Sequence, residues 1–126
     1  MKTIKQVYKI NAPISNVWKA LVDPKIIDKW GGGPAQIDEK VGTKFSLWGG
    51  DIHGKNIEIV PNKKLVQEWF GGDWKNPSRA IFTLTEIENG TELSLLHEDV
   101  PDEEVKEIDE GWKIYYLGPL KKLLEK

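Results

Sequence analysis

The side chains best suited to acid–base, nucleophilic or metal chemistry are few and scattered in this sequence. The two histidines, His53 and His97, lie far apart and show none of the short spacings typical of metal ligands on one helix. The chain has no cysteine, which excludes disulfides, thiol nucleophiles and thiolate zinc sites. The serines lack the context of a nucleophile elbow, and no phosphate-binding glycine loop followed by Lys and Ser or Thr is present. We therefore predict no catalytic residue, no metal and no cofactor.

His97 is nevertheless a candidate site residue. It shares one face of its expected strand with Leu93 and Leu95. If this face is the inner one, His97 lines the rim of a cavity; the alternative is a hydrogen-bonded histidine at the end of a strand. An enzyme would need an acid or base in a pocket, and only His97, Glu58 and Tyr116 offer one.

Aromatic residues are the strongest candidates for a binding site, because the chain has 6 tryptophans in 126 residues. Trp48, Trp69, Trp112 and Tyr116 lie on the strands and the helix that would bound a pocket. Aromatic rings with one polar edge suit an amphipathic cavity, but they equally suit a filled core. Trp18 and Trp30 lie on two short helices, where we expect them to pack.

Composition and charge restrict the function classes. The chain has 18 basic and 20 acidic residues, a net charge of −2, and Arg79 is its single arginine, which argues against nucleic-acid binding. No apolar run approaches the roughly 18 residues of a membrane helix, and the N-terminal residues lack the apolar core of a signal peptide. We expect a single domain over residues 1–126, located in the cytoplasm and not inserted in a membrane.

The order of elements predicts an α+β domain. Residues 3–10 show the alternation of a strand with one solvent-exposed face. Two short helices follow, and the second is capped by Asp23 before Pro24 and ended by the glycines at 31–33. Asn89-Gly90 is a strong hairpin signal. The further expected strands are 35–40, 43–48, 54–60, 64–70, 78–88 and 91–99. A long final helix begins after Pro101, and the curved antiparallel sheet of six or seven strands must bury its apolar face on it.

Two residues interrupt the final helix. Gly111 costs about 1 kcal/mol relative to Ala in a helix interior, and Pro119 removes a helical hydrogen bond. One interpretation is close backbone approach at Gly111 with a bend near Gly118 and Pro119. The other is a helix end near Tyr116 followed by a second short helix.

These elements and motifs resemble the START-like helix-grip (SRPBCC) superfamily. Within it, the chain is similar to the domain family named for the activator of the ninety-kilodalton heat-shock protein ATPase, of the C-terminal-domain type. Trp74 and Ser78 fall where that family has Trp and Ser. The four stretches that carry the resemblance are NAPISNVWKALVDPKIIDKW (11–30), FSLWGGDIHGKNIEIVPNKKLVQEW (45–69), TELSLLHEDVP (91–101) and GWKIYYLGPLKKLLE (111–125).

A curved sheet with one helix across it often leaves a gap between the two, so we expect a ligand cavity between the sheet and the C-terminal helix, and the resemblance implies the same helix-grip domain. Strand alternation predicts that the side chain of Glu58 faces solvent. The family pattern often has an acidic residue at this position, so a carboxylate that points into the cavity is the alternative. The residues expected to line the cavity are Trp48, Glu58, Trp69, Phe82, Leu84, Leu95, His97, Trp112 and Tyr116.

Three functional hypotheses follow. The first is non-catalytic binding of a small hydrophobic or amphipathic ligand by a stand-alone member of the family. The second, implied by the resemblance alone, is a stress-response partner of a ninety-kilodalton heat-shock chaperone. The third is an enzyme of the cyclase or hydratase type found elsewhere in the superfamily.

Overall fold

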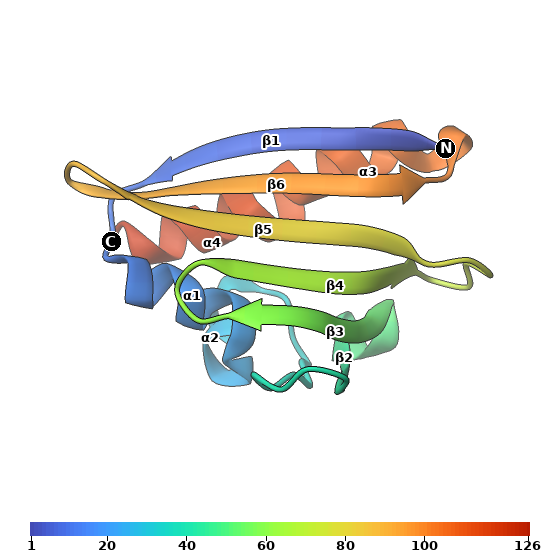
Figure 1. Ribbon diagram of the computed structural model, residues 1–126, viewed down its shortest axis with the longest axis horizontal. Coiled ribbons are helices and arrows are strands. Elements are labelled where there is room, and N and C mark those ends of the chain that lie inside the picture. Colours follow the sequence, from blue (N-terminus) through green and yellow to red (C-terminus); the bar gives the residue numbers. More distant parts are fainter.

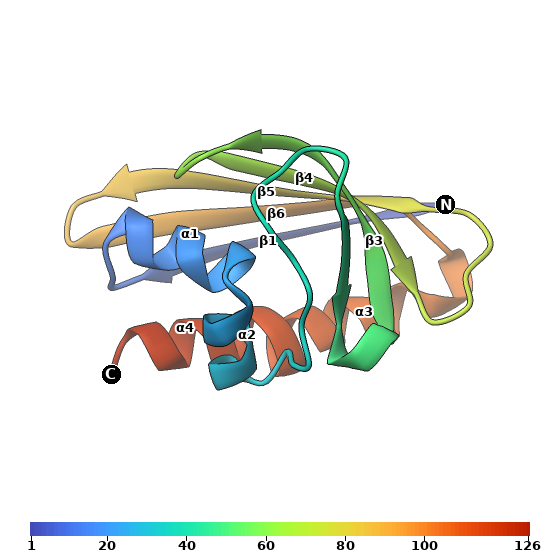
Figure 2. The ribbon, with the colours of Figure 1, turned by 90° about the horizontal axis from the view of Figure 1, so that it is seen from below.

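Alternation of buried and exposed side chains shapes the sheet. In β1 (Lys2–Ile10), the inward side chains Ile4, Gln6, Tyr8 and Ile10 alternate with residues that face solvent. The computed structural model describes residues 1–126, in which six antiparallel strands have the order β1-β6-β5-β4-β3-β2. The other strands are β2 (Lys44–Leu47), β3 (Ile52–Val60), β4 (Lys64–Gly71), β5 (Ser78–Ile87) and β6 (Gly90–Val100). Their inner face curves over the C-terminal helical segment (Figures 1 and 2), which confirms the predicted helix-grip architecture.

The two predicted short helices follow β1. They are α1 (Ile14–Val22) and α2 (Pro24–Trp30), and they cover one end of the inner sheet face (Figure 2). Asp23 caps α2, because its Oδ1 accepts a hydrogen bond from Lys25 N at 2.9 Å, and Gly31 ends it with a left-handed φ of 108°.

The segment 35–40 is not a strand, contrary to the prediction. It forms one isolated bridge, between Gln36 and Ser46. The side chain of Asn56 forms hydrogen bonds with two backbone carbonyl groups of this segment, since Nδ2 donates to Asp38 O at 2.9 Å and to Lys40 O at 3.2 Å. Because these two carbonyl oxygens already accept hydrogen bonds from a side chain, they do not require hydrogen bonds from a neighbouring strand.

The C-terminal helical segment runs along the inner face of the sheet (Figure 2). It consists of the short turn η2 (Asp102–Glu104), α3 (Val105–Gly111), the wider π-helical turn η3 (Trp112–Tyr116) and α4 (Leu117–Leu124). A Cβ at Gly111 would meet nothing within 4 Å, whereas a Cβ at Gly118 would lie 2.0 Å from the Lys113 carbonyl oxygen. The close backbone contact therefore occurs at Gly118 and not at Gly111. The helical segment continues through the π-turn, but Tyr116 has a non-helical φ of −115° and ψ of −81°, and the short helix α4 begins directly after it.

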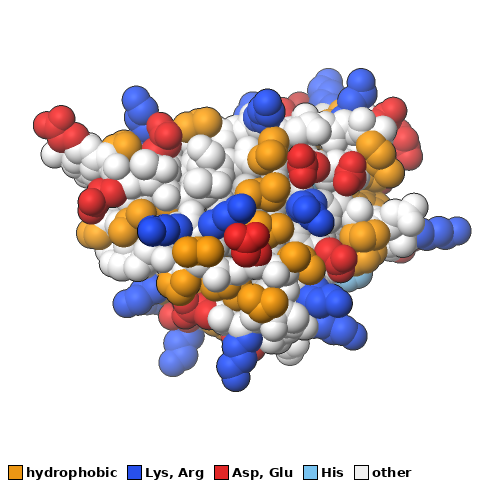
Figure 3. Space-filling model, viewed as in Figure 1, with side chains coloured by type: hydrophobic (Ala, Val, Ile, Leu, Met, Phe, Trp, Pro, Cys, Tyr) orange, Lys and Arg blue, Asp and Glu red, His pale blue; other side chains and the backbone are white.

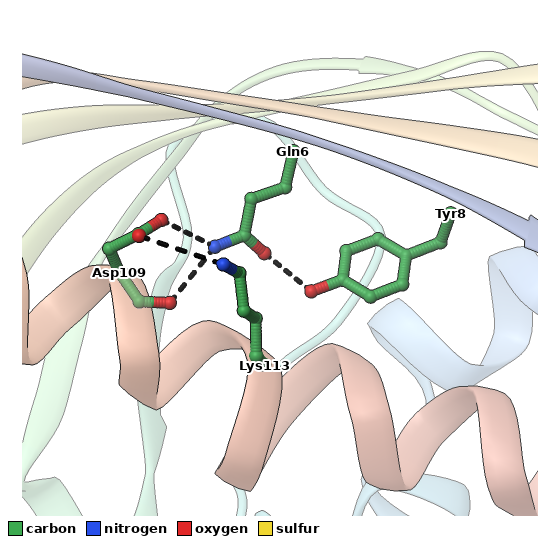
Figure 4. A network of polar contacts seen from close by, with 4 residues as sticks. All are labelled: Gln6, Tyr8, Asp109 and Lys113. Atoms are coloured by element: carbon green, nitrogen blue, oxygen red, sulfur yellow. Dashed lines mark hydrogen bonds and ion pairs between the residues drawn. The ribbon is translucent and has the colours of Figure 1, made fainter.

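A polar network joins β1 to this helical segment (Figure 4). Gln6 Nε2 donates to the backbone oxygen of Asp109 at 2.9 Å and to its Oδ1 at 2.7 Å. The Tyr8 hydroxyl donates to Gln6 Oε1, and Lys113 Nζ lies 3.8 Å from Asp109 Oδ2. Burial, followed by the charge of Asp109, raises the pKa of Tyr8 to about 12. These contacts set the position of the helix against the edge strand.

Candidate functional site

A pocket of about 420 Å³ opens between the helical segment and the strongly curved β2–β4 end of the sheet. Its walls come from four parts of the chain: the short turn η1 (Trp48–Gly50) with the start of β3, then β4, α3 and η3. The apolar lining residues are Trp48, Ile52, Trp69, Ile108, Trp112, Tyr115 and Tyr116. Asp51, Glu107 and Gly111 complete the lining.

The aromatic walls are packed against one another. Trp69 and Trp112 stack with ring centroids 5.3 Å apart and planes inclined by 28°. Tyr116 lies 4.7 Å from Trp112 and 6.0 Å from Trp48, measured between ring centroids. These separations are typical of favourable aromatic pairs, so the rings form a preorganised wall.

One polar atom in this wall has no partner. The indole nitrogen Nε1 of Trp69 is buried and makes no hydrogen bond within the chain. By contrast, Trp74 Nε1 donates to Glu104 Oε2 at 2.6 Å, and Trp30 Nε1 donates to the Ala20 oxygen at 2.9 Å. A buried donor without an acceptor costs roughly 1–3 kcal/mol, which makes the Trp69 indole an unusual feature of this pocket wall.

His97 lies behind the aromatic wall and is fully buried. Its Nδ1 accepts a hydrogen bond from Trp112 Nε1 at 3.0 Å, and its Nε2 lies 2.7 Å from Ser78 Oγ. Desolvation by burial lowers the pKa of His97 to about 3. His97 therefore stays neutral at physiological pH and supports the wall instead of forming its rim.

The structure brings four of the nine predicted site residues together in the pocket, namely Trp48, Trp69, Trp112 and Tyr116. Phe82, Leu84 and Leu95 are almost completely buried members of the core, so they do not line this pocket.

The prediction that Glu58 lines the cavity is wrong. Glu58 pairs in register with Val66 after an irregularity between Asn56 and Glu58, which places it on the outer face of the sheet. Its side chain is 50% exposed, and Oε2 lies 3.6 Å from Lys64 Nζ. Simple strand alternation gave the correct side for this residue, and the family pattern did not.

Six lining residues did not appear in the predicted set: Asp51, Ile52, Glu107, Ile108, Gly111 and Tyr115. Helical spacing carried a signal for some of them, since Ile108, Trp112 and Tyr115 follow one another at intervals of four and three residues. The two carboxylates had no such signal, because their position depends on how the turn before β3 meets α3.

The acid–base groups that an enzyme would need are not brought together. Glu58 lies on the opposite face of the sheet from His97, and the ring of Trp112 contacts both His97 and Tyr116. Burial raises the pKa of Tyr116 above its usual range. No group of three or more His, Cys, Asp or Glu side chains is arranged to hold a metal ion, and no helix is both long and apolar enough to cross a membrane.

A curved antiparallel sheet over a C-terminal helix, with a pocket between them, defines an α+β helix-grip domain. The chain belongs to the family described as "Activator of Hsp90 ATPase homolog 1-like protein", whose model matches residues 11–125.

Two sequence relatives illustrate the family. The human activator of 90 kDa heat shock protein ATPase homolog 1 is 27% identical over 121 residues, which cover 94% of this chain and 35% of the relative. A Schizosaccharomyces pombe protein, C1711.08, is 29% identical over 120 residues, which cover 94% of this chain and 36% of the relative. The chain thus spans about a third of the length of these relatives.

A solved structure of similar length shares the whole fold. The crystal structure of an HSP90 activator from Plasmodium falciparum superposes with a TM-score of 0.92 at 26% sequence identity. The superposition covers 98% of this chain and 96% of that one.

Proposed function

We propose that this protein binds a small hydrophobic or amphipathic ligand, without catalysis, in the pocket between its curved sheet and its C-terminal helix. The observation that carries the proposal is the pocket of about 420 Å³ with its aromatic walls. Binding sites for small molecules are typically concave, mostly apolar and preformed, with a few polar groups.

The unpaired indole of Trp69 supports the same conclusion. Its N–H lies in a pocket wall, is buried and lacks an acceptor. A small adjustment of the wall would let an oxygen of a bound ligand accept this hydrogen bond, and the ligand would then remove a cost that the free protein carries.

Tryptophan fluorescence provides the test. Titration with a panel of lipids, amphiphilic amines, aromatic alcohols and bile-acid-like compounds should change the emission saturably for at least one probe. Gly111→Leu should abolish the change, since a side chain at Gly111 enters open space at the pocket. Lys106→Leu adds the same side chain at an exposed position of α3 and should bind as the parent does. The proposal fails if no probe gives saturation, or if the Gly111 variant binds as well as the parent.

A second candidate function is that of a partner of a ninety-kilodalton heat-shock chaperone. The observation that favours it is the length-matched Plasmodium structure, which is described as an HSP90 activator. Both candidates assume the cytoplasmic location expected from the sequence.

An ATPase assay tests this second candidate. Addition of the protein to the host's ninety-kilodalton chaperone should raise the rate of ATP hydrolysis in a dose-dependent and saturable manner, and immobilised protein should capture the chaperone. Including Gly111→Leu separates the two candidates, because this variant fills part of the pocket and changes no other part of the surface. An unchanged hydrolysis rate together with no capture would rule out the chaperone role.

A further inference from the structure

The charged side chains that line the pocket are all of one sign. Asp51 and Glu107 approach it from different sides, Asp51 from the turn before β3 and Glu107 from α3. Both residues are exposed, and neither forms an ion pair, because the four ion pairs of the chain involve other residues. The lining contains no lysine, arginine or histidine. A ligand in this pocket therefore meets two uncompensated carboxylates and no positive charge.

The segment that forms one rim of the pocket is itself acidic. Residues 102–110 contain Asp102, Glu103, Glu104, Glu107, Asp109 and Glu110 against the single cation Lys106. Only two of these carboxylates are paired with cations: Asp102 with the N-terminal amine at 2.8 Å and Asp109 with Lys113 at 3.8 Å. Clustered charges of one sign beside a low-dielectric cleft concentrate the field there, so we expect a negative potential at the pocket.

The aromatic walls favour the same sign of ligand charge. Five of the lining residues are Trp or Tyr. The faces of these rings carry a negative quadrupole and attract ammonium groups within about 6 Å of the ring centroid. Carboxylates beside aromatic rings are a chemical combination that recognises an amine or a quaternary ammonium group. A ligand with a carboxylate or phosphate group would have to bring a second negative charge to these carboxylates without a basic partner.

We propose that the pocket selects a cationic amphiphile, that is, a primary amine or quaternary ammonium compound with an aromatic or aliphatic body. This inference rests on the proposed ligand-binding function and adds the sign of the ligand's charge. The body packs on Trp48, Trp69 and Trp112, and the ammonium group lies at the rim between Asp51 and Glu107. An acceptor oxygen in the body is compatible with the Trp69 indole.

Three probes with a common skeleton test this charge selectivity. They are 4-phenylbutylamine, the neutral 4-phenylbutan-1-ol and 4-phenylbutyrate, titrated into the full chain while the tryptophan indole and Gly111 amide signals are followed by NMR. The amine should bind most tightly and the carboxylate most weakly. Raising the salt concentration should weaken binding of the amine and leave binding of the alcohol unchanged, because only the amine is attracted by charges that salt screens.

Conservative variants assign the selectivity to the two carboxylates. The double variant Asp51→Asn/Glu107→Gln should weaken amine binding about three- to tenfold, as expected for two exposed charge contacts, and leave alcohol binding unchanged. Glu103→Gln, an exposed change in the same acidic segment but outside the lining, should weaken amine binding much less than the double variant does and leave alcohol binding unchanged.

The possible results distinguish charge selection by the pocket from ligand binding itself. If the alcohol or the carboxylate binds as tightly as the amine, or if the double variant keeps full amine affinity, charge selection is refuted while ligand binding stands. If none of the three probes shifts the pocket signals saturably, the ligand-binding function fails for this chemical class, and the cationic preference fails with it.

Discussion

Trp112 and His97 are joined by a hydrogen bond of 3.0 Å from the indole Nε1 to the imidazole Nδ1, and this bond defines the tautomer of a buried histidine. Because Nδ1 accepts, the ring proton lies on Nε2, which donates to Ser78 Oγ at 2.7 Å. The serine hydroxyl in turn donates to the Trp69 carbonyl oxygen at 2.6 Å. Every donor in this series of hydrogen bonds has an acceptor only while the imidazole is neutral. If Nδ1 were protonated, it would be a second donor facing the indole N–H of Trp112.

The first prediction concerns the pH dependence of stability. The pKa of His97 is about 3 in the folded protein against 6.5 for an unperturbed histidine, so the unfolded chain binds this proton more readily. The contribution of His97 to the free energy of unfolding is therefore complete above about pH 6.5 and is lost as the pH decreases toward 3. We expect a loss of about 2 kcal/mol in the free energy of unfolding between pH 7 and pH 5, measured by urea denaturation.

Two variants assign this slope. His97→Gln should remove most of the loss between pH 7 and pH 5, whatever its effect on absolute stability. His53→Gln should retain the loss, because His53 lies at a partly exposed position beside Phe70. Equal slopes in the parent and in His97→Gln would contradict the prediction.

The second prediction tests the serine in the same chain of hydrogen bonds. Ser78 is buried, and Ser78→Ala would leave His97 Nε2 and the Trp69 carbonyl without this partner. We expect a loss of roughly 1–3 kcal/mol in unfolding free energy, measured at pH 7. Ser94→Ala, on the outer face of β6, should change stability by less than about 0.5 kcal/mol. Similar values for the two variants would exclude a structural role for this hydrogen bond.

Much of the fold was predictable because local signals and the final structure agree. The Asn89-Gly90 turn joins β5 to β6 in the predicted hairpin, with a left-handed φ of 68° at Asn89. The Asp23 cap before Pro24 is present as predicted. Each of these features depends on a few neighbouring residues, and a single sequence contains that information.

Features that depend on contacts between distant segments were less accessible. The aromatic part of the pocket was predicted from residues on separate elements, but its acidic rim depends on how the turn at Asp51 meets Glu107 in space. The register irregularity next to Glu58 and the use of Asn56 to satisfy residues 38–40 also lack a local sequence signal. Tertiary packing determines these features.

The third prediction compares two glycines of the C-terminal helical segment. Gly111 has helical geometry, with φ −60°, and open space at its missing Cβ, so Gly111→Ala should raise the unfolding free energy by up to about 1 kcal/mol through better helix propensity. A Cβ at Gly118 would meet the Lys113 oxygen at 2.0 Å, and Gly118→Ala should cost roughly 1–3 kcal/mol through overpacking. Thermal unfolding of both variants measures this difference, and the same sign of change in both would contradict it.

The fourth prediction concerns the contact between β1 and α3. Burial, with a second contribution from the charge of Asp109, holds the pKa of Tyr8 at about 12 against a usual value of 10. Asp109→Asn removes this charge and should lower the pKa of Tyr8, whereas Glu110→Gln, an exposed change at the next position, should not. Ultraviolet titration measures the pKa when each variant is compared with the same variant carrying Tyr8→Phe.

The same shift contributes to the loss of stability at alkaline pH. The folded protein holds the Tyr8 proton more tightly than the unfolded chain does, so this group's contribution to stability is complete below about pH 10 and is lost as the pH rises toward 12. Tyr8→Phe should therefore lose less stability over this interval than the parent. An identical alkaline decline in the two proteins would show that the pKa of Tyr8 is not raised in the folded protein.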